Sequence, residues 1–172
     1  MNDNNDVQLT HLDHHADDQQ FPLILLLDDV SDAANVGAIF RVADALGVER
    51  LLLCGDTVVP PNRRLTRTSR ATDKVVGHQY YEDAVAALST QSAQGYHCIA
   101  LELTQQSVDI KTVDFGALGK VCLILGAEQR GVNARLLENV AQTVHIPMLG
   151  QNSSMNVATA CAVGVYEITR QL

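Results

Sequence analysis

Three stretches of this chain are apolar at almost every position. They lack the alternation of apolar and polar residues that is typical of a strand with one solvent-exposed face. Residues 23–27 read LILLL, residues 50–54 read RLLLC and residues 120–125 read KVCLIL. Strands that are covered on both faces have this pattern, and such strands are typical of parallel sheets. Helical patterns separate the runs, as the crossover connections of a parallel sheet require. The sequence therefore predicts an α/β fold with a mainly parallel sheet and helices on both faces.

The other elements follow from periodicity and turn residues. Apolar residues recur at helical spacing after Asn35, and Gly47 ends that helix. We expect two more helices over residues 81–91 and 133–140, and two more strands over residues 96–103 and 143–148. Residues 104–119 are predicted to be mostly a connector, and residues 63–74 a long loop. The length suits one domain, over residues 21–172.

Residues 155–168 form a run with one charged residue, Glu167, and many small side chains. The run is too long for a strand and too short for a membrane span. It predicts a buried helix that opens from the polar loop 149–154, with Ser153 or Ser154 near its N-cap. The N-terminus of such a helix can bind an electron-rich group. The alternative is a capped core helix that follows a turn.

The chain has a net charge of −8, which argues against a nucleic-acid partner, but the charge is unevenly distributed. Residues 63–74 carry +4, so the rest of the chain carries −12. A basic segment on an acidic body can bind phosphates, and a solvated surface loop is the alternative. The candidate RNA-binding residues are Arg63, Arg64, Arg67, Arg70 and Lys74.

Residues 1–20 are polar and acidic, and we expect a flexible arm there. The arm has neither the basic region nor the apolar region of a signal peptide. Its three histidines and the four cysteines of the chain lack the spacing of metal ligands, so no metal site is predicted. Buried, reduced thiols indicate a cytoplasmic protein, and no run is long enough to cross a membrane.

Three polar, glycine-bearing loops are expected at the carboxyl ends of strands, where open α/β sheets bind ligands. They cover residues 28–37, 126–132 and 148–154. The second reads GAEQRG from residue 126. It is not a dinucleotide fingerprint, because Glu128 stands where the middle glycine should be and the loop follows the fourth predicted strand.

Together the loops resemble the three motifs of the SpoU/TrmH family of S-adenosylmethionine-dependent RNA ribose 2′-O-methyltransferases, in the SPOUT superfamily. The matching segments are NVGAIFR at 35–41, LILGAEQRGV at 123–132, IPM at 146–148 and SMNVA at 154–158. They have the family's order and spacing, and the resemblance runs from about Leu23 to the C-terminus. Met155 stands where the family more usually has leucine. The family's RNA-binding extensions are missing or reduced to the acidic arm, which leaves the choice of RNA open.

The resemblance implies a C-terminal trefoil knot, a homodimer and an RNA substrate, either tRNA or rRNA. It implies S-adenosyl-L-methionine as cofactor, in contact with Leu101, Leu103, Gly126, Ile146 and Met155. The implied catalytic residues are Arg41, Asn35, Glu128, Ser154 and Asn156. The family's proposals make Arg41 the general base, but a guanidinium is effectively always protonated, so stabilisation of a developing alkoxide is the alternative. An RNA-binding or ribosome-assembly protein with the same fold and little turnover is the competing function.

Overall fold

The computed structural model describes residues 19–172. The predicted acidic arm and its histidines therefore lie outside the described residues, apart from Gln19 and Gln20. No helix in the described part of the chain is long and apolar enough to cross a membrane.

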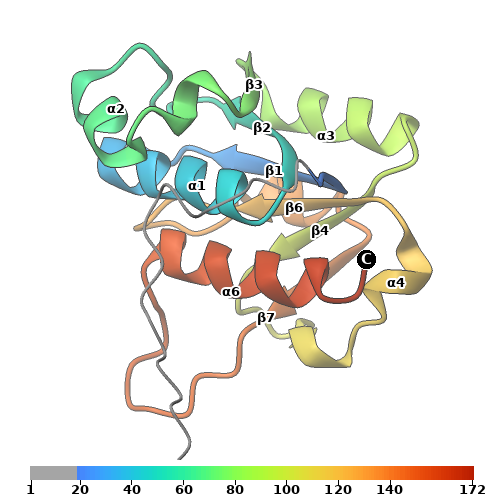
Figure 1. The fold of residues 1–172 in the computed structure, drawn as a ribbon. Coiled ribbons are helices and arrows are strands. Elements are labelled where there is room, and N and C mark those ends of the chain that lie inside the picture. Colours follow the sequence, from blue (N-terminus) through green and yellow to red (C-terminus); the bar gives the residue numbers. More distant parts are fainter. Residues whose placement is uncertain (1–18) are drawn as a thin grey trace, which may run out of the picture.

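Strands and helices alternate along the described chain (Figure 1). The strands are β1 (Phe21–Asp28), β2 (Val48–Cys54), β3 (Gly77–Tyr81), β4 (His97–Leu101), β5 (Val108–Asp109), β6 (Val121–Leu125) and β7 (Gln142–His145). The α-helices are α1 (Ala33–Ala45), α2 (Arg63–Ser69), α3 (Ala84–Ala93), α4 (Phe115–Leu118), α5 (Ala134–Leu137) and α6 (Val157–Thr169). Two 3₁₀-helices are η1 (Thr72–Lys74) and η2 (Ile110–Thr112).

The strands form one sheet in the order β3-β2-β1-β6-β4-β7-β5, and every pair is parallel. The predicted parallel α/β fold is confirmed. Two strands were not predicted, because β3 has no apolar run and β5 has only two residues. Tyr81 ends β3 rather than beginning a helix, and the following helix starts only after its N-cap, Asp83. The predicted trefoil knot stays a prediction.

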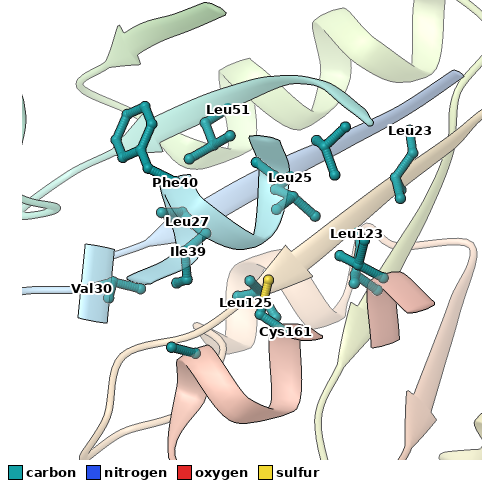
Figure 2. Packing of buried hydrophobic residues seen from close by; sticks show 14 of the residues in the cluster. Leu23, Leu25, Leu27, Val30, Ile39, Phe40, Leu51, Leu123, Leu125 and Cys161 are labelled. Carbon is teal, nitrogen blue, oxygen red and sulfur yellow. The ribbon is translucent and has the colours of Figure 1, made fainter. Parts of the chain in front are cut away.

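Each apolar strand buries side chains on both faces of the sheet. Leu23, Leu25 and Leu27 pack against α1 and α6, as Figure 2 shows for part of this cluster. Ile24 and Leu26 point to the other face, against α3 and α5. Burial on both faces removes the need for a polar face, which is why these strands show no alternation.

The basic segment is a helix rather than the predicted long loop. Asn62 caps α2, because its side chain accepts hydrogen bonds from the backbone N–H groups of Arg64 (3.0 Å) and Leu65 (3.1 Å). Leu65 is fully buried against the α1 side of the core. At Gly37 of α1 a Cβ would lie 2.7 Å from the Leu65 carbonyl, so α2 packs closely on α1 there. The prediction failed because one buried leucine in seven residues gives no visible helical period.

The C-terminal helix begins two residues later than predicted. The N-cap of α6 is Asn156, whose Oδ1 accepts from the N–H groups of Ala158 (2.9 Å) and Thr159 (3.3 Å). Ser153 and Ser154 are therefore not the cap but exposed loop residues before it. Asparagine caps helices as well as serine does, so sequence preference alone did not distinguish them.

Candidate active site

One pocket of about 470 Å³ lies where the strands β4, β6 and β7 end and α6 begins. All three polar loops were expected at this edge of the sheet, and two of them line the pocket directly. The five predicted cofactor-binding residues all line it, as do Glu128, Ser154 and Asn156 of the predicted catalytic set. The other lining residues are Glu102, Leu125, Ala127, Gln129, Arg130, Gly131, His145, Met148, Ser153, Val157 and Ala160.

The loop after β6 closes on itself through two backbone hydrogen bonds between Ala127 and Gly131, of 3.1 and 2.8 Å. At Gly126 a Cβ would lie 2.1 Å from the Gly131 carbonyl carbon, and Gly131 itself has φ +66°. The family resemblance implied only that Gly126 contacts the cofactor. The structure shows a different requirement, because the loop's own backbone fills that space. The two glycines thus allow a tight turn that presents Glu128 and Arg130 at its tip.

Glu102 joins this loop to the end of β4. Its Oε2 accepts from the backbone N–H of Val132 (3.0 Å), and its Oε1 accepts from the backbone N–H of Leu103 (2.9 Å). A Cβ at Gly131 would lie only 2.3 Å from the same Oε2. Sequence reasoning pointed to the neighbouring Leu101 and Leu103 but missed Glu102. A carboxylate near the end of a predicted strand, at the carboxyl edge of the sheet, was the available signal.

A chain of three side chains links the polar loops at the mouth of the pocket. Asn156 Nδ2 donates to Asn35 Oδ1 (2.9 Å), and Asn35 Nδ2 donates to Glu128 Oε1 (2.7 Å). Because the Oδ1 of Asn156 caps α6, its NH₂ group must face Asn35, and the NH₂ group of Asn35 must then face Glu128. The backbone N–H of Asp32, the N-cap of α1, also faces Glu128 Oε1, at 3.4 Å. The helix cap thus orients both amides.

Arg41 is not part of this arrangement within one chain. Arg41 is exposed, but it does not line the pocket. It follows Asn35 by six residues on α1, which is about 9 Å along the axis and on another side of the helix. Among the described residues it forms no ion pair. α2 covers the side of α1 on which Gly37 lies.

The pocket combines apolar walls with carboxylates. Leu101, Ile146 and Met155 supply apolar surface, whereas Glu102 and Glu128 supply negative charge. His145 also lines the pocket, with its Nδ1 3.0 Å from Ser107 Oγ. This donor set suits a ligand with a flat apolar part and a positive charge. No group of three metal-ligating side chains occurs among residues 19–172.

Asp28, at the carboxyl end of β1, holds the chain that follows the 126–132 loop of the pocket. Its Oδ2 accepts from the backbone N–H of Asn133 (2.9 Å), which fixes the chain just after the 126–132 loop. Burial raises the pKa of the Asp28 carboxyl above its ordinary value, and the Asn133 hydrogen bond opposes part of that rise.

The basic segment presents cations to solvent beside the N-terminus of α1. All five predicted RNA-binding side chains are exposed. Its one acid, Asp73, is buried, and its carboxylate accepts from the hydroxyl groups of Thr66 (3.1 Å) and Ser69. The segment therefore exposes five cations and no carboxylate of its own. Arg64 lies 3.4 Å from Asp32, the cap that also contacts Glu128, so the segment adjoins the amide chain.

Comparisons with known proteins agree with this geometry. The sequence model of the SpoU rRNA Methylase family matches residues 22–166. The tRNA (guanosine(18)-2′-O)-methyltransferase of Escherichia coli K12 is 33% identical over 158 residues, which are 89% of this chain and 65% of that protein. The 23S rRNA (guanosine-2′-O-)-methyltransferase RlmB of Haemophilus ducreyi is 34% identical, over 87% of this chain and 60% of its own length. The chain thus spans less than two thirds of these relatives.

A solved structure described as an AdoMet-bound rRNA methyltransferase from Sinorhizobium meliloti superimposes with a TM-score of 0.83. It is 29% identical and matches 90% of this chain and 58% of its own. The TrmH/SpoU tRNA modifying enzyme of A. aeolicus gives a TM-score of 0.80 at 28% identity, over 90% of this chain and 77% of its own.

Proposed function

The chain belongs to the SpoU rRNA methylase family, and on that premise we propose that it methylates the ribose 2′-oxygen of a nucleotide in tRNA or rRNA. The methyl donor in this proposal is S-adenosyl-L-methionine. One observation carries it: a single pocket is lined by both the 126–132 loop and the 145–156 loop, and Asn35 of the first motif is hydrogen-bonded to its rim.

The pocket residues fit the proposed cofactor. The apolar side chains of Leu101, Ile146 and Met155 suit the adenine ring, and Gly126 and Leu103 complete the predicted set. The sulfonium and ammonium groups are cationic, so the carboxylates of Glu102 and Glu128 complement them. The cofactor supplies an activated methyl group, and the protein must place the ribose hydroxyl against it.

The amide chain would position the ribose and keep the loops in register. Glu128 is exposed and accepts from Asn35, so this hydrogen bond holds its carboxylate at the rim of the pocket. Ser154 lies on the opposite loop and is exposed, where its hydroxyl can reach the RNA. These roles in orientation explain why one carboxylate and two amides occur together, since a carboxylate ends a chain of donors.

Arg41 would serve the pocket of a second copy in a homodimer. An apolar groove of about 610 Å³ lies beside the pocket, lined on α6 by Val163 and Tyr166, which are 41% and 63% exposed. Ile146 lines both the groove and the pocket, so a partner seated in the groove would adjoin the site. The Arg41 guanidinium of that partner could then stabilise the developing alkoxide and bind a phosphate.

The cationic face of α2 and η1 would bind RNA phosphates next to the pocket. Each neutralised phosphate releases counterions, so affinity should fall as salt rises. Free, buried cysteines support the further proposal of a reducing, cytoplasmic location.

The decisive experiment is methyl transfer from labelled S-adenosylmethionine to total tRNA and rRNA from a strain that lacks the gene. Mapping of 2′-O-methyl positions in that strain and its parent should reveal one lost modification, which the purified protein restores. Asn156→Ala is the matched variant, because it removes the amide chain and the α6 cap. RNA binding without label on any RNA would reject the transferase and favour the binding-only function.

A further inference from the structure

Tyr80 is an exposed aromatic side chain that the site described above does not use. It lies on β3, the edge strand of the sheet, and is 52% exposed. β3 carries no charged residue, and Val75 just before it is 76% exposed. An exposed aromatic ring can stack on a partner that has its own flat face.

The register of the sheet connects Tyr80 to the pocket. Tyr80 pairs with Leu53, Leu53 with Leu27, and Leu27 with Leu125, which lines the pocket. These four residues form one row across the sheet, so their side chains point to the same face. Three strand spacings separate the ends of the row, which is about 14 Å. Tyr80 therefore lies at the carboxyl edge of the sheet, a few nucleotides of RNA from the pocket.

The same face carries the cationic segment. Leu27 and Leu53 belong to the core that packs on α1, and the His78 ring meets Phe40 of α1 edge-on, with centroids 5.4 Å apart. α2 packs on α1 at Gly37, and Figure 1 shows the two helices side by side. The arginines of α2 are exposed, and Tyr80 lies in register with Leu53, which faces α1. Lys74 is only six residues before Tyr80 and is exposed.

We propose that Tyr80 stacks on an unpaired nucleobase of the substrate RNA, while the cations of α2 and η1 hold the flanking phosphates. Proteins bind single-stranded RNA by this combination, because every base has a face that can stack on an aromatic ring. The inference rests on the proposed function. It places an unpaired nucleotide a few positions from the methylated one, since a duplex base offers no free face to Tyr80.

The test compares Tyr80→Ala with Tyr80→Phe, which keeps the ring, and with Gln79→Ala as the matched control. Gln79 is the exposed neighbour on the same strand, and it points to the other face. The probe is a short single-stranded RNA with fluorescein at one end, and the same strand annealed to its complement. Anisotropy titrations at several salt concentrations give the affinity and the salt slope.

Tyr80→Ala should bind the single strand roughly 5- to 150-fold more weakly, with Tyr80→Phe and Gln79→Ala near the parent. Its duplex affinity and its salt slope should be unchanged, because stacking releases no counterions. Parental single-strand affinity in Tyr80→Ala, or an equal loss for the duplex, would overturn the inference. A change in sedimentation instead of RNA affinity would also overturn it, and would assign Tyr80 to a protein interface.

Methyl transfer separates failure of this inference from failure of the proposed function. If the parent methylates RNA and Tyr80→Ala has parental affinity and rate, only the stacking inference is wrong. If the parent neither binds the probe nor labels any RNA, the proposed function is wrong as well, and the inference with it.

Discussion

Glu102 lies so close to Gly131 that replacing this glycine should destabilise the protein by an amount that follows from the structure. In Gly131→Ala the new methyl group would lie 2.3 Å from Glu102 Oε2, at a backbone φ of +66°. The carboxylate is the end of a flexible side chain and can move, but moving breaks its hydrogen bond to the buried Val132 N–H. The substitution should therefore lower the free energy of unfolding in two ways: it strains the backbone at residue 131, and it breaks the hydrogen bond of Glu102.

A left-handed conformation costs a residue with a Cβ about 1–2 kcal/mol. A hydrogen bond to a charged group contributes about 1.5–3 kcal/mol. Gly131→Ala should therefore lower the free energy of unfolding by about 2.5–5 kcal/mol, and Glu102→Ala by about 1.5–3 kcal/mol. In the double variant the hydrogen bond is lost only once, so the total should equal that of Gly131→Ala alone. The coupling energy is about 1.5–3 kcal/mol.

Urea unfolding of the parent, both single variants and the double variant measures this coupling. Gly95→Ala is the matched control, because Gly95 has φ +85° and a Cβ there would meet no atom within 4 Å. It reports the backbone cost alone. If the losses in the free energy of unfolding of the two single variants add up in the double variant, to within about 0.5 kcal/mol, the reasoning is refuted. Glu102 would then not hold the 126–132 loop in place. Because the 126–132 loop lines the pocket, the binding free energies of S-adenosylmethionine measured by calorimetry should be non-additive in the same way.

Three further predictions concern chemistry, charge and assembly. Arg41→Ala should bind S-adenosylmethionine like the parent but transfer methyl roughly 10²–10³-fold more slowly in single-turnover assays, and Arg41→Lys should rescue it poorly because an ammonium lacks the planar fork. Burial raises the pKa of Asp28 above 3.8, so the folded state binds more protons and the free energy of unfolding should fall as pH rises from about 4; Asp28→Asn, which still accepts from Asn133, should flatten that slope in urea titrations. Tyr166→Glu, in the apolar groove, should give a monomer in sedimentation velocity where the parent gives a dimer, and a monomeric parent would contradict the homodimer.

The strands and loops of the site could be predicted because their signals are local. A run such as residues 23–27 is apolar throughout because both of its faces are buried, and that requirement is written in consecutive residues. The glycines at 126 and 131 mark a tight turn, because one has no room for a Cβ and the other has a positive φ. This signal is also local in the sequence. The motif residues Glu128, Ser154 and Asn156 followed from the resemblance, which preserves spacing along the chain.

Weak local signals were misread or missed. The helix α2 shows one buried leucine, and β3 has no buried side chain except at its partly buried end. Both elements exist because a neighbour holds them: α1 packs on α2 at Gly37, and β2 pairs with β3 along its whole length. Where packing rather than propensity decides, a single sequence carries little information.

The sequence alone determined the parallel sheet, its buried strands and the three polar loops, because hydrophobic burial and turn geometry act on neighbouring residues. Only the tertiary structure decided which side chains meet. Asn156 and Asn35 are 121 residues apart, Asn133 and Asp28 are 105 apart, and Val132 and Glu102 are 30 apart. Hydrogen bonds at such separations form only after the sheet has brought its carboxyl ends together. No pattern along the chain encodes them, since each partner alone is an ordinary polar residue in a loop.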